Sequence, residues 1–411
     1  MNKNKKRFIS FALILTFSFV LASFSAAQDL TYIPKLNFSG EYNDNILYTR
    51  DDKIDDFIFN ITPGLELRYA SELMDLRSFA AIRFRQYLSE SDFDREDYIV
   101  NLQGRYRMTE RLRLSTRLSY VEDYTLETRI IDFTDPPIED VPIDEAPVDE
   151  VEMIERGIER FLSERKQYNA HLSMNHRLTP LSNLNISYRY LKTDYDLEQN
   201  TDYDSHNVNL AYMRRLSGQK DQIGTRLGYR QRTSDVSDTD SYEIGLIWNH
   251  IFTETVSIYS DLGFRYTEQT FKDTRTDRDN WNAIANIRLR KRGETGVVDV
   301  GLRQNIQTAS TGETVNVSRL YWFARQALTE RVQFELSGDF YITREDADSF
   351  LDSDSTYFDI IPTLRYLLTE NHSVRLAYNY TIDHDRTLDS DRDKQRNRIW
   401  IMFDFGFPGK W

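Results

Sequence analysis

The sequence predicts an all-β protein: a closed antiparallel transmembrane barrel of about 18 strands, with short periplasmic turns and longer outer loops. Three observations predict it. The chain begins with a secretory signal, the remainder alternates between apolar and polar residues, and short turns recur at nearly even intervals. A count of 16 strands also fits, because element boundaries read from a sequence are uncertain by roughly 2–4 residues.

Composition sets the first limits on function. The chain has 411 residues, no cysteine, 25 Tyr, 24 Phe and a formal net charge of −14. The acidic balance argues against a nucleic-acid partner, because phosphate binding depends on clustered positive charge. The lack of cysteine excludes disulfides, thiolate metal sites and cysteine nucleophiles.

Residues 1–27 are predicted to be a signal peptide. Residues 3–7 carry four positive charges, residues 8–20 are apolar, and Ser25-Ala26-Ala27 supplies the small residues of a cleavage site. The apolar run is shorter than the roughly 20 residues of a membrane-spanning helix, so a retained anchor is the weaker alternative. Removing four positive charges and no acids from −14 leaves −18 on the mature chain, residues 28–411.

In the mature chain, apolar and polar residues alternate with a period of two residues. Between residues 57 and 69 one parity carries Phe57, Phe59, Ile61, Leu65, Leu67 and Tyr69, and the other carries Asn60, Thr62, Gly64, Glu66 and Arg68. The alternation recurs at 332–342 and 374–383, with further copies near 112–124, 184–191, 223–232, 242–250, 256–266 and 281–290. Runs of about 9 to 14 residues exceed the usual soluble strand and suit a tilted bilayer crossing.

Short turns supply the strand count. Thr-Glu pairs occur at 109, 253, 329 and 369, and looser turns start at 71, 179, 217 and 293. Successive starts are 36 to 40 residues apart, one hairpin each, except for one interval of 70 residues that carries an insertion. Eight turns join nine hairpins. The connections on the other side are expected to be longer and acidic, as at 234–240, 345–354 and 385–393, with their acids solvated rather than binding calcium.

The last strand carries a predicted assembly signal. Its alternate positions end in Phe403, Phe405, Phe407 and the terminal Trp411. A C-terminal aromatic strand resembles the signal by which outer-membrane barrels are recognised, whereas the alternative is an ordinary buried terminal strand. The expected location is therefore the cell outer membrane, with its lipid and the barrel-assembly machinery as partners.

Arginines dominate the polar parity, which is expected to face the lumen. The predicted pore-lining residues are Arg83, Arg85, Arg105, Arg107, Arg113, Arg117, Arg226 and Arg230. Acids on this parity are fewer and include Glu243 and Asp261. Guanidinium groups on a pore wall attract anions and hydrogen-bond sugar hydroxyls or carboxylates, and the alternative is simple pairing with acids across strands.

Residues 126–166 form a predicted acidic insertion in the third outer loop. From Ile130 to Glu155 there are ten acids and no Lys, Arg or His, and residues 148–166 have the spacing of an amphipathic helix. The hypothesis is that this loop folds inward and constricts the pore through Asp132, Asp135, Glu139, Asp140, Asp144 and Glu145. The alternative is an external flap or a docking site.

No catalytic site is predicted. The six histidines are scattered, and no HExxH, GxSxG or Walker-type motif is present. We therefore expect no enzyme activity, no metal and no cofactor.

A family resemblance adds a function. The segment Gly40-Glu41-Tyr42-Asn43-Asp44-Asn45-Ile46-Leu47, followed by Ile61-Thr62-Pro63-Gly64-Leu65, resembles the opening of the β-barrel porin-2 group. That group includes outer-membrane barrels of exopolysaccharide operons. The resemblance implies a pore for hydrophilic solutes, associated with polysaccharide export and with periplasmic export proteins. A general diffusion porin and a non-conducting surface-binding barrel are the alternatives.

Overall fold

The computed structural model describes residues 30–125, 163–198, 200–216, 218, 220–272, 276–308, 314–345, 354–387 and 390–410. The predicted signal peptide and Trp411 lie outside these residues. In the described ranges the chain forms 18 long strands, one two-residue strand and a single 3-10 turn, η1 (Ser91–Phe93). No helix in these ranges is long and apolar enough to cross a membrane.

The strands follow one another along the chain. The first nine are β1 (Leu30–Asn43), β2 (Asp56–Ala70), β3 (Met74–Tyr87), β4 (Arg95–Arg107), β5 (Leu112–Tyr124), β6 (Glu164–Thr179), β7 (Ser182–Tyr195), β8 (Tyr203–Arg215) and β9 (Asp221–Ser234). The others are β10 (Ser237–Ile251), β11 (Val256–Phe271), β12 (Arg278–Arg292), β13 (Gly296–Thr308), β14 (Thr314–Ala327), β15 (Val332–Glu345), β16 (Asp354–Leu367), β17 (His372–Thr387), β18 (Ser390–Gly406) and β19 (Gly409–Lys410).

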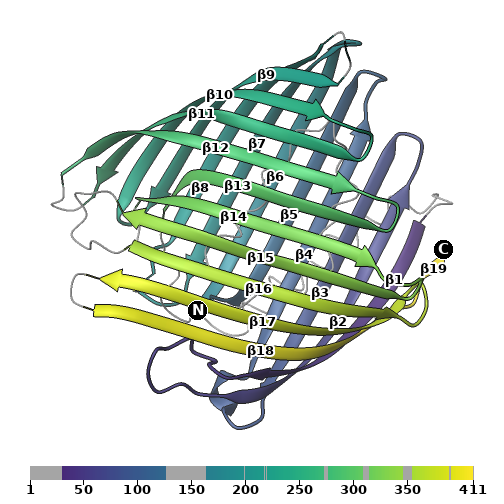
Figure 1. The fold of residues 1–411 in the computed structure, drawn as a ribbon, viewed down its shortest axis with the longest axis vertical. Helices are drawn as coiled ribbons and strands as arrows, with labels where there is room; N and C mark the ends of the chain where they lie inside the picture. The colour runs from purple at the N-terminus through teal and green to yellow at the C-terminus, as the bar shows by residue number, and fades with distance from the viewer. Residues whose placement is uncertain are drawn as a thin grey trace, which may run out of the picture.

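These strands close into a barrel (Figure 1). Each long strand pairs antiparallel with its neighbours in sequence, and β1 pairs with β2 on one side and with β18 on the other. The first and last strands meet with Phe38 opposite Phe403, and β19 continues the closure beside Thr31 and Tyr32. The predicted closed antiparallel barrel of 18 strands is confirmed.

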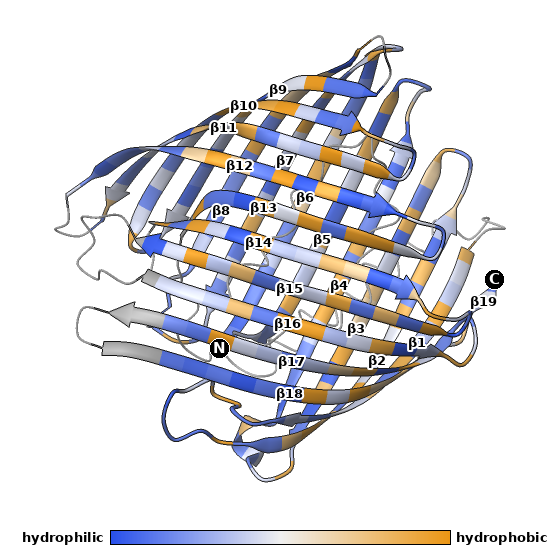
Figure 2. Cartoon of the chain, viewed as in Figure 1, coloured by the Kyte–Doolittle hydropathy of each residue, from blue (hydrophilic) through white to orange (hydrophobic). Residues whose placement is uncertain are grey.

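The outer face of the barrel is apolar and the inner face is polar. On β2, Phe57 and Phe59 are about half exposed, at 51% and 53%, whereas their neighbours Ile58 and Asn60 are buried inside the barrel. Figure 2 shows hydrophobic and hydrophilic residues alternating along the strands. A closed ladder with an apolar exterior is what a bilayer requires, because hydrocarbon cannot satisfy free backbone groups.

Polar side chains mark both edges of the apolar band. Near the outer loops, five outward-facing tyrosine hydroxyls donate to carboxylates at 2.6 to 3.2 Å: Tyr42 to Asp55, Tyr98 to Glu96, Tyr120 to Glu122, Tyr229 to Asp240 and Tyr266 to Asp279. We call these pairs the tyrosine girdle. At the opposite end of β9 and β10, Trp248 Nε1 and His250 Nδ1 lie 3.0 and 2.7 Å from Asp221 Oδ1. Aromatic rings with polar tips are typical of membrane interfaces.

The repeated short turns share one hydrogen-bond pattern. Thr109 Oγ1 accepts the backbone N–H of Leu112 at 3.0 Å, and Thr329 Oγ1 accepts that of Val332 at 3.0 Å. Such side-chain acceptors stabilise a tight turn by replacing a backbone partner. All eight predicted turn positions separate consecutive strands, so the hairpin count from the sequence is confirmed.

Several predicted boundaries are wrong at the outer end. Strands β9 and β10 continue through most of 234–240 and leave only residues 235–236 as a turn, and β17 and β18 cover most of 385–393. Strand β6 begins at Glu164, so the last three residues of the predicted insertion and helix are strand. Beyond the lipid, water contacts both faces of a strand. The strands therefore continue pairing there without the apolar alternation by which the sequence identifies them.

The C-terminal strand is apolar on its outer face, as expected. Phe403 and Phe407 are exposed there and Phe405 is half-buried. The alternation does not run to the terminus, because β18 ends at Gly406, shortly before Pro408, and the chain resumes pairing only in β19. Recognition of these residues by assembly machinery stays a prediction.

Candidate functional site: the inner wall of the barrel

Charged pairs cross the seam between the first and last strands. Arg398 Nε donates to Glu41 Oε1 at 2.6 Å, and both side chains are buried. Asn37 donates to Asp404 at 2.8 Å, and Arg375 of β17 binds the same carboxylate at 2.8 and 2.9 Å. Hydrogen-bonded charges therefore line this part of the inner wall, beside an apolar cluster of Ala377, Trp400 and Met402.

The opening motif fastens the first outer loop, residues 44–55, to this seam. Asn45 is fully buried: its Nδ2 donates to the carbonyls of Thr49 at 2.6 Å and Gln395 at 3.0 Å, and its Oδ1 accepts the Thr49 N–H at 2.9 Å. Asp44 accepts the backbone N–H of Asn397 at 2.7 Å. These bonds join β1 to β18 beyond the end of their ladder.

Part of this loop, at Ile46 and Tyr48, packs against the inner wall. Tyr48 is only 5% exposed and has a φ of 52°, and the Arg396 guanidinium carbon lies 4.7 Å from the centre of its ring. Ile46 packs with Ile58 and Tyr87, two inward-facing side chains of β2 and β3. The first half of the outer loop 44–55 therefore lies against the inner wall at the outer mouth of the barrel.

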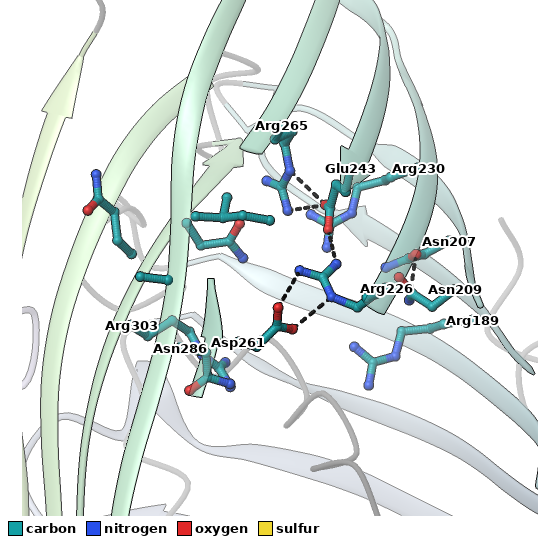
Figure 3. Close-up of a pocket in the computed structure, with 14 residues that line it drawn as sticks. Arg189, Asn207, Asn209, Arg226, Arg230, Glu243, Asp261, Arg265, Asn286 and Arg303 are labelled. Atoms are coloured by element: carbon teal, nitrogen blue, oxygen red, sulfur yellow. Dashed lines mark hydrogen bonds and ion pairs between the residues drawn. The ribbon is translucent and has the colours of Figure 1, made fainter. Parts of the chain in front are cut away.

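A recess lined by arginines lies on the wall formed by β7 to β13. Figure 3 shows the side chains that line it. Its charged residues are Arg189, Arg226, Arg230, Arg265 and Arg303, with Glu243 and Asp261. Asn207, Asn209, Asn286 and Asn305 supply amide groups. We call this site the arginine recess.

Ion pairs order one side of the recess. Arg226 donates to Asp261 at 2.7 and 3.3 Å and also binds Glu243, and Arg265 Nε donates to Glu243 at 2.7 Å. Glycine leaves room for this network: a Cβ on Gly245 would lie 2.7 Å from Asp261 Oδ1 and 3.4 Å from Arg226 Nη2. A side chain at position 245 would therefore displace the ion pair.

The recess carries an excess of positive charge. The described residues that line the recess include five guanidinium groups and two carboxylates, a formal charge of +3. In the described part of the chain no ion pair involves Arg303, and Asn286 Oδ1 is buried without a hydrogen-bond partner. A guanidinium and an amide free to bind suit an anionic or hydroxylated solute.

The eight predicted arginines all lie on the inward-facing parity, in two groups. Arg226 and Arg230 line the arginine recess. The other six lie on β3 to β5. Arg83 and Arg85 are buried: Arg83 lies 3.4 Å from Asp97, and Arg85 donates to Asn60 at 2.9 Å. Arg117 is half-buried. Arg105, Arg107 and Arg113 are exposed near a short turn, with Arg107 opposite Arg113. Arg83 therefore lies beside an acid, as the alternative interpretation expects, and the attraction of anions by the exposed arginines stays a prediction.

The predicted constriction residues cannot be placed. Asp132, Asp135, Glu139, Asp140, Asp144 and Glu145 lie outside the described residues. Among the described residues, Ile46 and Tyr48 of the first outer loop pack against the inner wall, which the sequence did not predict. Across the described ranges no group of three or more His, Asp or Glu side chains could hold a metal ion.

No protein family matches the chain, and no curated protein does either. The resemblance to the β-barrel porin-2 group therefore gains no support from these comparisons.

Several solved outer-membrane barrels are similar in overall shape. Pseudomonas aeruginosa OccK2 (OpdF), solved in complex with glucuronate, is 10% identical over 93% of this chain and 99% of its own, with a TM-score of 0.48. The outer membrane protein OpdK of the same organism is 11% identical over 93% and 100% of the two chains, with a TM-score of 0.46. Acinetobacter baumannii OccAB3 is 10% identical over 92% and 100%, also with a TM-score of 0.46. At these values no residue role or substrate is transferred to this chain.

Sequence reasoning missed the amides and the glycine of the recess. Asn207, Asn286 and Asn305 have no distinctive spacing along the chain, and ladder register alone brings them together. Gly245 gave a weak signal, because a glycine inside a strand often marks a close approach by other atoms.

Proposed function

We propose that this protein is an outer-membrane channel for small hydrophilic solutes and that it prefers anions. The apolar exterior and the closed ladder support insertion into a membrane, and the polar inner wall supports a hydrated path. The single observation that carries the anion preference is the arginine recess, where five guanidinium groups face two carboxylates.

The excess charge is large enough to matter. Two unit charges 4 Å apart interact by about 1 kcal/mol in water and about 4 kcal/mol at an effective dielectric constant of 20. Since roughly 1.4 kcal/mol is a factor of ten, the unpaired guanidinium of Arg303 alone can favour an anion over a cation several-fold. The effect weakens with salt, because the Debye length is about 10 Å at 0.1 M.

Reversal potentials of the purified, folded protein in planar bilayers test this proposal. Under a KCl gradient at low ionic strength we expect chloride to be more permeant than potassium. Arg303→Glu should shift the preference toward cations, because it lowers the excess in the recess from three charges to one. The matched control is Lys291→Glu, the same charge change at an exposed position on the outer face of β12.

Two results would count against the proposal. A cation-selective parent protein would contradict the anion preference, and so would equal shifts in the two variants. A folded protein without any conductance would remove the channel itself and favour the surface-binding alternative.

Polysaccharide export is the more specific function that the family resemblance suggests, and nothing in the comparisons supports it. An export conduit would depend on periplasmic and inner-membrane partners, whereas a small-solute channel conducts alone. Adding long oligosaccharides to the bilayer chamber separates the two. Persistent block of single-channel current would favour a sugar-binding conduit, and unaltered current would favour the small-solute channel. We propose no enzymatic activity for either.

A further inference from the structure

The barrel wall is forked between β12 and β13, which are neighbours in the front of Figure 1. Their ladder runs only from Arg292 opposite Val297 to Ala285 opposite Gln304. Beyond that point β12 continues to residue 278 paired with β11 alone, and β13 continues to residue 308 paired with β14 alone. In the described ranges no ladder joins residues 278–284 to residues 305–308.

Side chains satisfy both backbone groups of Ile306, on the part of β13 that has separated from β12. The Ile306 N–H donates to Asn305 Oδ1 at 2.9 Å, and the Ile306 carbonyl accepts from Arg265 Nη1 at 2.9 Å. Arg265 reaches across from β11 and is held by Glu243. An unsatisfied backbone group costs several kcal/mol in hydrocarbon, so these contacts allow the edge of β13 to stay open.

The fork opens within the outer half of the apolar band. Trp281, which is 67% exposed on the outer face of β12, pairs with Tyr266 of the tyrosine girdle across the β11–β12 ladder. Ala285, the last paired residue, lies four positions further toward the periplasmic end. At about 3.4 Å per residue the gap therefore extends roughly 14 Å along the strand below the interface.

The arginine recess reaches into this gap. Its lining includes three consecutive residues of β12, Ile284, Ala285 and Asn286, and three of β13, Arg303, Gln304 and Asn305. Ala285 and Gln304 form the last pair of the β12–β13 ladder, so the recess adjoins the point where the two strands separate.

We propose that the fork is a lateral portal for amphiphilic anions, of which alkyl carboxylates are the simplest class. The carboxylate binds the Arg303 guanidinium in the recess, and the alkyl chain passes between β12 and β13 beside Ala283 and Ile284 into the outer leaflet. A neutral solute would leave the positive excess uncompensated, and a wholly hydrophilic one would not enter lipid. The portal requires the barrel to lie in a membrane but does not depend on ion conduction.

Photo-labelling of the full-length protein in phosphatidylcholine vesicles tests the binding step. The probe is dodecanoate with a photoreactive diazirine at its methyl end. We expect labelled peptides that contain residues 281–286 and 303–306, and this labelling should be displaced by excess dodecanoate but not by dodecanol. Arg303→Gln should weaken the displacement roughly ten-fold, as expected for a hydrogen bond to a charged group. Lys291→Gln, on the outer face of the same strand, should not weaken it.

A covalent staple tests the passage. Ala283 and Ile306 would face each other if the ladder continued in register, and the chain has no cysteine of its own. Ala283→Cys with Ile306→Cys, joined by a bifunctional thiol reagent, should abolish dodecanoate labelling at the fork. The matched control, Leu246→Cys with Leu262→Cys, staples two outward-facing residues that already pair in the β10–β11 ladder and should leave the labelling intact.

The portal is overturned if labelling at the fork equals that of the lipid-facing β10–β11 surface, if dodecanol competes as well as dodecanoate, or if the staple changes nothing. Chloride conductance measured on the same preparations reports on the channel separately. A conducting protein with no fork labelling would retain the channel and remove the portal.

Discussion

The seam pair of Glu41 and Arg398 gives the strongest prediction about stability. Glu41→Gln removes the carboxylate that Arg398 Nε binds at 2.6 Å, and the Arg398 side chain is only 2% exposed. Breaking one partner of a buried ion pair typically costs about 3–5 kcal/mol, because the other charge stays buried without compensation. We therefore expect the folding equilibrium to fall by a factor between roughly one hundred and several thousand.

Urea unfolding of the barrel in lipid vesicles, followed by tryptophan fluorescence, measures this loss. The double variant Glu41→Gln with Arg398→Gln should recover a large part of it, because no uncompensated charge remains. The control is Asp51→Asn in the exposed pair with Arg50, where we expect a cost of about 0–1 kcal/mol. The reasoning is refuted if Glu41→Gln costs no more than Asp51→Asn, or if the costs of the two seam changes simply add.

Three further predictions concern the lumen. Gly245→Val should lower single-channel conductance, because its Cβ would lie 2.7 Å from Asp261 Oδ1 and displace that carboxylate from its ion pair. Unaltered conductance in a folded variant would contradict the packing described. Glu243→Gln should shift the reversal potential toward chloride, since it removes one of two acids from the recess, and a shift toward potassium would contradict this charge balance. Replacing residues 47–53 with a short Gly-Ser linker should raise conductance, and no rise would show that the first outer loop does not narrow the mouth.

The membrane-facing part of the fold could be predicted from the sequence for a physical reason. Lipid accepts only apolar side chains on one parity of each strand, so residues such as Phe57 and Phe59 disclose both the strand and its orientation. Several turns were predictable because they share one local acceptor, as Thr109 and Thr329 supply.

Features that depend on distant residues could not be predicted in this way. Asn45 holds the carbonyl of Gln395, 350 positions away, and nothing near Asn45 in the sequence identifies that partner. The fork arises because β12 and β13 separate beyond Ala285, although both segments still read as strands. The predicted arginines share the inward-facing parity, but only the register between seven strands reveals which of them share a recess.

The tyrosine girdle also has a consequence for the membrane around the protein. On β9 the outer pair at Tyr229 and the periplasmic pair at Asp221 are eight residues apart. At about 3.4 Å per residue and a strand tilt of about 40°, this separation corresponds to a hydrocarbon thickness of roughly 21 Å. A typical bilayer core measures about 30 Å, so the barrel is matched to a thin membrane and would compress a thicker one around its rim. Hydrophobic mismatch would then favour residence in the outer membrane over thicker bilayers, independently of any targeting sequence.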